Sequence, residues 1–166
     1  MMQSKKAQFY IFMAIILSVY ALALVAPAAR SPPESAFRGL LDNYLFEAPK
    51  VVNSALYSGT TTGAQLANFT DSYVAFSRSL EPKFGILYGY SHDGVTDIRS
   101  RMWEDANITA GRTSFMLKDA SAQINSTDGF TAYVNRRAYV FNLSKESAIQ
   151  ALFVSRNERG ANIFKG

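Results

Sequence analysis

The chain has 166 residues and a formal net charge of +4, from 17 lysine and arginine residues and 13 aspartate and glutamate residues. It contains no cysteine and a single histidine. This composition excludes disulfides, thiolate nucleophiles, cysteine-based metal centres and a histidine cluster within one chain. Setting aside Lys5 and Lys6 leaves an excess of two positive charges, too small to indicate a specific nucleic-acid-binding surface.

The first predicted element is a transmembrane helix at residues 8–29. No charged side chain occurs between Lys6 and Arg30. A helix of this length spans about 34 Å, enough to cross a hydrocarbon core of about 30 Å in contact with membrane lipid. Lys5 and Lys6 precede the apolar run, so the positive-inside rule places the N-terminus in the cytoplasm. We therefore expect a single-pass protein of the cell membrane with its C-terminal domain outside the cell.

The junction Lys6-Ala7-Gln8-Phe9 places a basic and a small residue directly before the apolar helix. It resembles the class III signal peptide of archaeal type IV pilins and archaellins. The resemblance implies that a prepilin peptidase cuts between Ala7 and Gln8, which makes residues 1–7 a cleaved leader and Lys6, Ala7 and Gln8 the processing site. It also implies that the helix is kept as an anchor and later forms a filament core with copies of the chain or related subunits. Phe12 stands where many such proteins carry a glutamate.

Two other interpretations of this stretch stay open. The first is an uncleaved signal anchor, for which the length is suitable. The second is a secretory signal peptide cut near Ala26-Pro27-Ala28, which has the small-x-small form of a cleavage site.

Residues 30–34 form a proline-rich spacer, and residues 35–166 are expected to form one extracytoplasmic α+β domain. Apolar residues recur at three- and four-residue spacings from Ser35 to Leu56, which predicts an amphipathic helix bent at Pro49. A second helix is predicted from about Ala64 to Leu80. Gly59 should end the first helix, and a threonine should cap the second. We expect an αα-hairpin packed on a small antiparallel β-sheet or sandwich, although the first helix could instead pack on neighbouring subunits.

After Pro82 the pattern becomes typical of β-strands, with Ser91-His92-Asp93-Gly94 as a hairpin turn. Residues 104–111 are expected to form a loop. The predicted strands are residues 84–90, 95–103, 113–118, 130–134, 138–143, 148–154 and 161–164.

Four N-x-[ST] sequons support export and N-glycosylation. Their asparagines are Asn68, Asn107, Asn125 and Asn142. A surface that is simply rich in serine, threonine and asparagine is the alternative explanation.

Other candidate sites are weaker. His92 could act as a base beside Ser91 and Asp93, but sequence neighbours in a turn point apart, so a solvated turn is the ordinary interpretation. Tyr88 and Tyr90 could line an adhesive surface or pack in the core. One acidic group could bind calcium: Asp93, Asp97, Glu104 and Asp105. One group of arginines could form a basic face for acidic glycans, a surface layer or released DNA, or simply a solvated strand face: Arg99, Arg101, Arg112, Arg136, Arg137, Arg156 and Arg159.

The sequence contains no convergent nucleophile and base, so we predict neither an enzyme nor a cofactor. The favoured hypothesis is a pilin-like surface subunit that displays a glycosylated, β-rich domain outside the cell. The alternative is a single-pass, membrane-anchored binding domain that never polymerises.

Overall fold

The computed structural model describes residues 34–125, 129–143, 148–157 and 160–166. The processing site, the predicted membrane helix and most of the spacer lie outside the described residues. Within the described ranges, no helix is both long and apolar enough to cross a membrane. These ranges form two helices and two antiparallel sheets, which confirms the predicted α+β class.

The two helices form the predicted hairpin, α2 (Glu34–Ser58) followed by α3 (Thr62–Leu80). Gly59 follows α2 with a φ of 67°, a left-handed conformation that suits glycine after a helix. A threonine, Thr61, stands at the N-cap of α3 as expected, but its side chain makes no capping hydrogen bond. The apolar stripe of α2 is buried within its own domain. Its buried members are Phe37, Leu40, Leu41, Tyr44, Ala48, Val52 and Ala55.

The helix α3 differs from its predicted pattern. Phe76 and Leu80, which continue the predicted apolar spacing, are more than half exposed. Thr70, Val74 and Ser77 are buried instead. The buried face of α3 therefore mixes small polar residues with apolar ones, which periodicity of apolar residues alone could not reveal.

The larger sheet has five strands in the order β5-β2-β1-β8-β9. Its strands are β1 (Phe84–His92), β2 (Val95–Arg101), β5 (Ser121–Ile124), β8 (Ile149–Asn157) and β9 (Gly160–Lys165). Asp93 and Gly94 both have positive φ angles, 47° and 77°, in the two-residue turn between β1 and β2. The predicted turn is confirmed, but Ser91 and His92 belong to β1.

The smaller sheet has four strands in the order β4-β3-β6-β7. Its strands are β3 (Ala106–Ala110), β4 (Thr113–Leu117), β6 (Phe130–Val134) and β7 (Arg137–Phe141). The prediction of a loop over residues 104–111 is wrong, because β3 lies inside that range and pairs with both β4 and β6. The strand β5 was not expected either.

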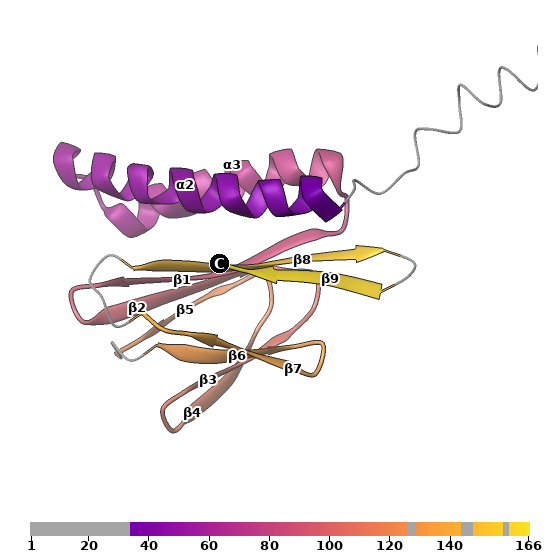
Figure 1. The fold of residues 1–166 in the computed structure, drawn as a ribbon. Helices are drawn as coiled ribbons and strands as arrows, with labels where there is room; N and C mark the ends of the chain where they lie inside the picture. Colours follow the sequence, from indigo (N-terminus) through magenta and orange to yellow (C-terminus); the bar gives the residue numbers. More distant parts are fainter. Residues whose placement is uncertain (1–33, 126–128, 144–147, 158–159) are drawn as a thin grey trace, which may run out of the picture. The chain divides into compact units, whose positions relative to one another are not determined.

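The helices cover one face of the five-stranded sheet, and the four-stranded sheet covers the other (Figure 1). Two cores result, a helix-side core between the helices and the sheet and a sandwich core between the two sheets. The central strand β1 is buried on both faces. Of the two predicted alternatives, the sandwich is correct, with an αα-hairpin on its outer face.

Two glycines on β1 allow close packing: Gly89 faces the second sheet, and Gly85 faces Met102, which follows β2. A Cβ atom at Gly89 would lie 2.6 Å from the ring of Phe130 and 2.7 Å from a methyl carbon of Leu143. At Gly85, a Cβ atom would lie 3.1 Å from the backbone of Met102. The large side chains of the sandwich core thus fill the space that these two glycines leave.

Candidate functional site

The four sequon asparagines are all exposed. Asn68 lies in α3 and Asn107 in β3, while Asn125 follows β5 and Asn142 follows β7. In one sequon, Asn107 and Thr109 share the exposed face of the smaller sheet, where the Thr109 hydroxyl lies 3.0 Å from that of Ser114. A sugar attached to any of these asparagines would therefore lie on the surface of the domain, outside both cores.

The threonine of the first sequon has a structural role. Thr70 is buried, and its hydroxyl donates to the carbonyl oxygen of Leu66 at 2.8 Å. The same hydroxyl lies 2.8 Å from the Tyr44 hydroxyl, which joins the two helices. In the folded domain, Thr70 is therefore a buried, hydrogen-bonded residue of the interface between the two helices.

His92 is half-buried at the end of β1 rather than solvated in a turn. Its Nε2 lies 3.0 Å from Oδ2 of Asp97, and its ring stacks on Tyr90 with the centroids 5.0 Å apart. Oδ1 of Asp97 accepts a hydrogen bond of 2.8 Å from Gln123. These contacts join β1, β2 and β5, and Nδ1 of His92 also lies 3.8 Å from Oδ2 of Asp93, so His92 has a structural role at this end of the sheet.

The predicted acidic group is not a shared site. Asp97 contacts His92 and Gln123, whereas Glu104 forms an ion pair with Arg156. In the part of the chain that the structure describes, no three residues of the metal-ligating types gather at one point. The calcium hypothesis is therefore not supported by the placement of these residues.

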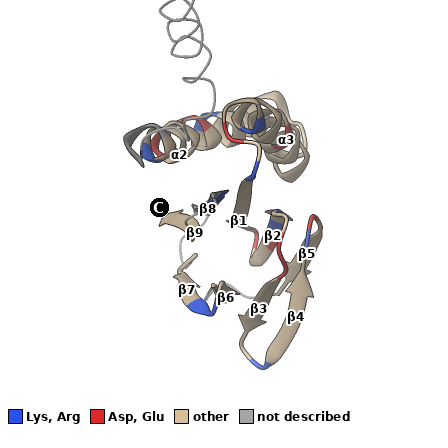
Figure 2. Ribbon diagram, turned by 90° about the vertical axis from the view of Figure 1, so that its right-hand side faces the viewer, with Lys and Arg blue, Asp and Glu red and all other residues tan. Residues whose placement is uncertain are grey.

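The predicted basic face is also dispersed, because lysine and arginine residues are spread over the helices and both sheets (Figure 2). Arg101 binds the carboxylate of Asp71 on α3 through two nitrogens, at 2.6 and 3.2 Å, and lies 3.6 Å from Asp119. The hydrogen bond to Asp71 raises the pKa of the Arg101 guanidinium. Arg159 lies outside the described residues.

Of the two interpretations of Tyr88 and Tyr90, the adhesive surface is wrong, because each residue is 1% exposed in the helix-side core. Burial raises the pKa of the Tyr88 phenol to about 12. Burial also raises the pKa of Tyr73, whose hydroxyl donates to the carbonyl oxygen of Leu40 at 2.6 Å, to about 12. The alternative expectation, core packing, is confirmed for both strand tyrosines.

The structure adds a pocket that the sequence did not reveal. It has a volume of about 540 Å³ and lies where β1 begins and where β2 and β6 end. Its apolar walls come from Pro82, Gly85, Met102, Val134 and Val154. Trp103 and three charged residues, Lys83, Glu104 and Arg156, complete the lining.

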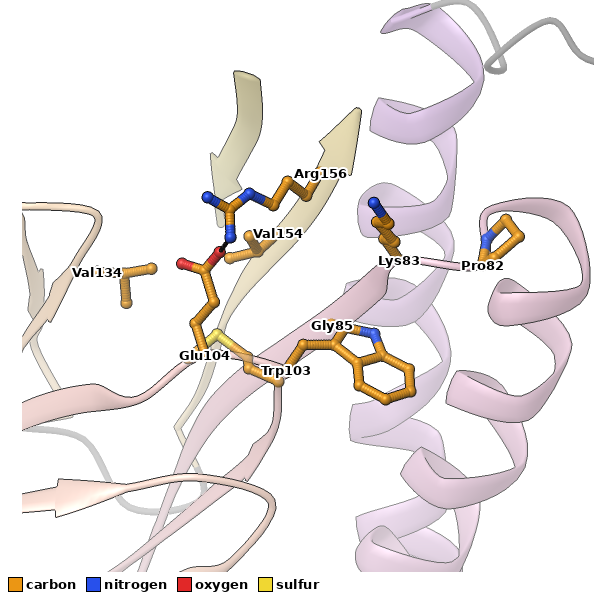
Figure 3. A pocket seen from close by; sticks show the side chains of 9 residues that line it. Pro82, Lys83, Gly85, Trp103, Glu104, Val134, Val154 and Arg156 are labelled. Carbon is orange, nitrogen blue, oxygen red and sulfur yellow. Dashed lines mark hydrogen bonds and ion pairs between the residues drawn. The ribbon is translucent and has the colours of Figure 1, made fainter. Parts of the chain in front are cut away.

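Figure 3 shows how the polar side chains of this pocket are arranged. Glu104 and Arg156 reach toward each other and form an ion pair. Trp103 lies on the side of the helices, where the guanidinium carbon of Arg78 is 4.5 Å from its ring centroid. The pocket thus combines an apolar wall, an aromatic ring and charges of both signs, which suits a small polar ligand with an apolar face.

Sequence reasoning missed this site because its members are far apart in the chain. Glu104 lies between β2 and β3, Arg156 lies in β8, and Trp103 was predicted to be the last residue of a strand. The single tryptophan of the chain was the one local signal. Comparisons of this chain with protein-family models, with curated proteins and with solved structures find no match.

Proposed function

We propose that this chain is a pilin-like surface subunit, anchored through residues 8–29 and displaying residues 35–166 outside the cell. The observation that carries the proposal is the contrast between a domain that buries its own apolar face and an apolar N-terminal segment. The described domain covers the apolar face of α2 with its own sheet and leaves all four sequon asparagines exposed. The apolar segment of residues 8–29 is then the part left to hold the subunit in lipid or in a helical filament core.

Packing between such helices would allow the subunit to reside first in the membrane and later in a filament. A helix without charged side chains is stable among lipid tails and equally stable among other apolar helices, so it can pass from membrane to filament. The partners are membrane lipid, a prepilin peptidase that acts at Lys6, Ala7 and Gln8, and copies of the chain or related subunits. The displayed domain needs no cofactor and no specific nucleic acid for this role.

The test is mass spectrometry of the mature N-terminus of the protein purified from cells that contain a prepilin peptidase. We expect the mature chain to begin at Gln8. Lys6→Ala should abolish this cleavage, whereas Lys5→Ala, which keeps the basic residue before Ala7, is the matched control and should be processed. An N-terminus near Ala29, or an intact Met1, would contradict the proposal.

Glycosylation is tested on the same material. We expect added mass on peptides that contain the exposed asparagines, and its loss from Asn107→Gln in the Asn107 peptide alone. Unmodified peptides at all four positions would contradict the proposed glycosylation.

The pocket favours a second candidate, the anchored binding domain that does not polymerise. A site of about 540 Å³ with an aromatic ring and paired charges is suited to ligand binding, which a purely structural subunit does not require. Mechanical shearing of cells separates the two candidates. A filament subunit is released in long assemblies, whereas an anchored domain stays with the membrane fraction.

A further inference from the structure

Trp103 is held in position before any ligand binds. The Arg78 guanidinium lies over its ring at 4.5 Å from the centroid. Arg78 is itself fixed, because it donates to the carbonyl oxygens of Phe84 at 3.1 Å and Arg101 at 3.0 Å, at the ends of β1 and β2. Trp103 is nevertheless 55% exposed and lines the pocket. A fixed, exposed ring loses little conformational entropy when a ligand covers it.

The charges around Trp103 favour an anionic ligand. Within the described ranges, neither Lys83 nor Arg78 has a carboxylate within ion-pair distance, whereas Arg156 and Glu104 neutralise each other. The pocket mouth therefore carries an excess of positive charge. A single carboxylate on a ligand could reach Lys83 and form a charge-assisted hydrogen bond.

Glu104 restricts which anion fits. A phosphodiester chain carries a negative charge on every phosphate group. Phosphates lying along the pocket would be repelled by the Glu104 carboxylate, which lines the same wall as Arg156 (Figure 3). A ligand with one carboxylate and several hydroxyl groups avoids this repulsion. Its hydroxyls can donate to the Glu104 carboxylate and accept from the Arg156 guanidinium, since the two groups lie side by side.

We propose that this pocket binds an acidic sugar, a hexuronic acid residue of a glycan. The apolar face of the sugar ring lies on Trp103, its carboxylate pairs with Lys83, and its hydroxyl groups bind Glu104 and Arg156. The volume of about 540 Å³ accommodates a sugar ring with its neighbour. This inference goes beyond the proposed function and holds whether or not the subunit polymerises.

The experiment uses the fluorescence of Trp103, the single tryptophan of the chain, in the full-length protein in detergent micelles. The probe is cellobiouronate, a disaccharide of glucuronate and glucose with a single carboxylate, and the neutral comparison is cellobiose. We expect a saturable change in emission with cellobiouronate at a Kd of about 1 mM or tighter, and binding of cellobiose weaker by about tenfold, because it lacks the charge that pairs with Lys83.

Two variants locate the site while keeping the tryptophan. Lys83→Ala should weaken cellobiouronate binding by about tenfold, and Glu104→Gln should weaken it because an acceptor for hydroxyls is lost. The matched control is Lys50→Ala, which removes an exposed lysine of α2 distant from the pocket lining. Circular dichroism identifies any variant that fails to fold, and Lys83→Gln then replaces Lys83→Ala.

Four outcomes overturn the proposal. They are an unchanged Trp103 emission throughout the cellobiouronate titration, equal binding of the two disaccharides, equal weakening by Lys50→Ala, and tighter binding of oligothymidylate than of cellobiouronate. None of them affects the N-terminal processing test, so failure here and failure of the pilin-like function are distinguishable.

Discussion

The two faces of the central strand β1 are covered in different ways. The helix-side core contains Phe37, Tyr44, Phe84 and Phe153, whose rings contact one another at centroid distances of 4.9 to 6.2 Å. The sandwich core consists mostly of aliphatic residues and one stacked pair, Phe130 and Phe141, with centroids 4.4 Å apart. Large rings fill the space between the helices and the sheet, whereas the second sheet comes close to β1 where Gly89 leaves room for Phe130 and Leu143.

The helix-side core also contains hydrogen-bonded hydroxyl groups. Tyr44 reaches Thr70 of α3, and Tyr73 reaches the backbone of α2 at Leu40. Each buried hydroxyl group that finds such a partner avoids the cost of an unmade bond. The helices are thus joined to each other by polar contacts as well as by packing.

The largest expected effect comes from Phe153, which is fully buried at the centre of the helix-side core. Phe153→Ala should lower the free energy of unfolding by about 3–5 kcal/mol. Leu152→Ala, on the next residue and in the sandwich core, should lower it by about 2–5 kcal/mol. Urea unfolding followed by circular dichroism measures both. A clearly smaller loss for Phe153→Ala would show that the aromatic core is the weaker of the two.

The close approach of the two sheets is tested at Gly89. Gly89→Ala forces a methyl group against Phe130 and Leu143, which should lower the free energy of unfolding by about 1–3 kcal/mol. Gly39→Ala is the matched control. Gly39 lies in α2 with no atom within 4 Å of an added Cβ, so this change should stabilise the domain by about 0.5–1 kcal/mol. Equal stability changes in the two variants would contradict the tight packing of β1.

The burial of Tyr88 is tested by the pH dependence of the free energy of unfolding. Burial raises its pKa from 10.0 to about 12. Above pH 10 the unfolded chain releases the phenol proton while the folded chain keeps it, so the contribution of Tyr88 is intact below pH 10 and is lost between pH 10 and 12. The loss approaches about 1.4 kcal/mol per pH unit. Tyr88→Phe should therefore unfold with a shallower pH dependence in this window.

The control for that measurement is Tyr57→Phe, because Tyr57 is 96% exposed. It should leave the pH dependence of the free energy of unfolding unchanged. A pH dependence of Tyr88→Phe identical to that of the wild-type chain between pH 10 and 12 would mean that the phenol is solvated.

The smallest effect is expected at the ion pair between the helices and the sheet. Asp71→Asn removes the charge that Arg101 binds, and because both side chains are partly exposed the loss should stay below about 1 kcal/mol. The loss should shrink further at high salt. Asp42→Asn on the exposed side of α2 is the control. If Asp71→Asn lowered the free energy of unfolding by more than Gly89→Ala does, charge rather than packing would be the main interaction that joins α3 to the sheet.

Local pattern predicted the elements whose residues alternate or repeat regularly. The stripe of α2 and the hairpin at Asp93 and Gly94 are of this kind. The strand β3 escaped prediction because its centre, Asn107-Ile108-Thr109, offers one apolar residue between polar ones. The strand β5 is a four-residue strand at the edge of the larger sheet, too short for its own pattern to predict it. In both cases the pairing partners, rather than the residues themselves, determine the conformation.

The order of the strands and the pocket could not be predicted from local pattern. The sheet pairs Phe84 with Ser155, and no periodicity connects two segments so far apart. The pocket depends on that pairing, because it brings Arg156 to Glu104 and places Val154 beside Gly85. The contact of Arg78 with Trp103 likewise joins a helix to the end of a strand.

The pairing of β1 with β8 also sets the sequence of events by which this domain can form. All four strands of the smaller sheet lie between β2 and β8 in the chain, so the central strand keeps one open edge until the other strands have been synthesised. Such long-range closure slows folding, and the open edge of β1 is a template for pairing with another chain in the meantime. A chaperone that shields β1 during this interval should raise the yield of the folded domain more than one that acts on the helices.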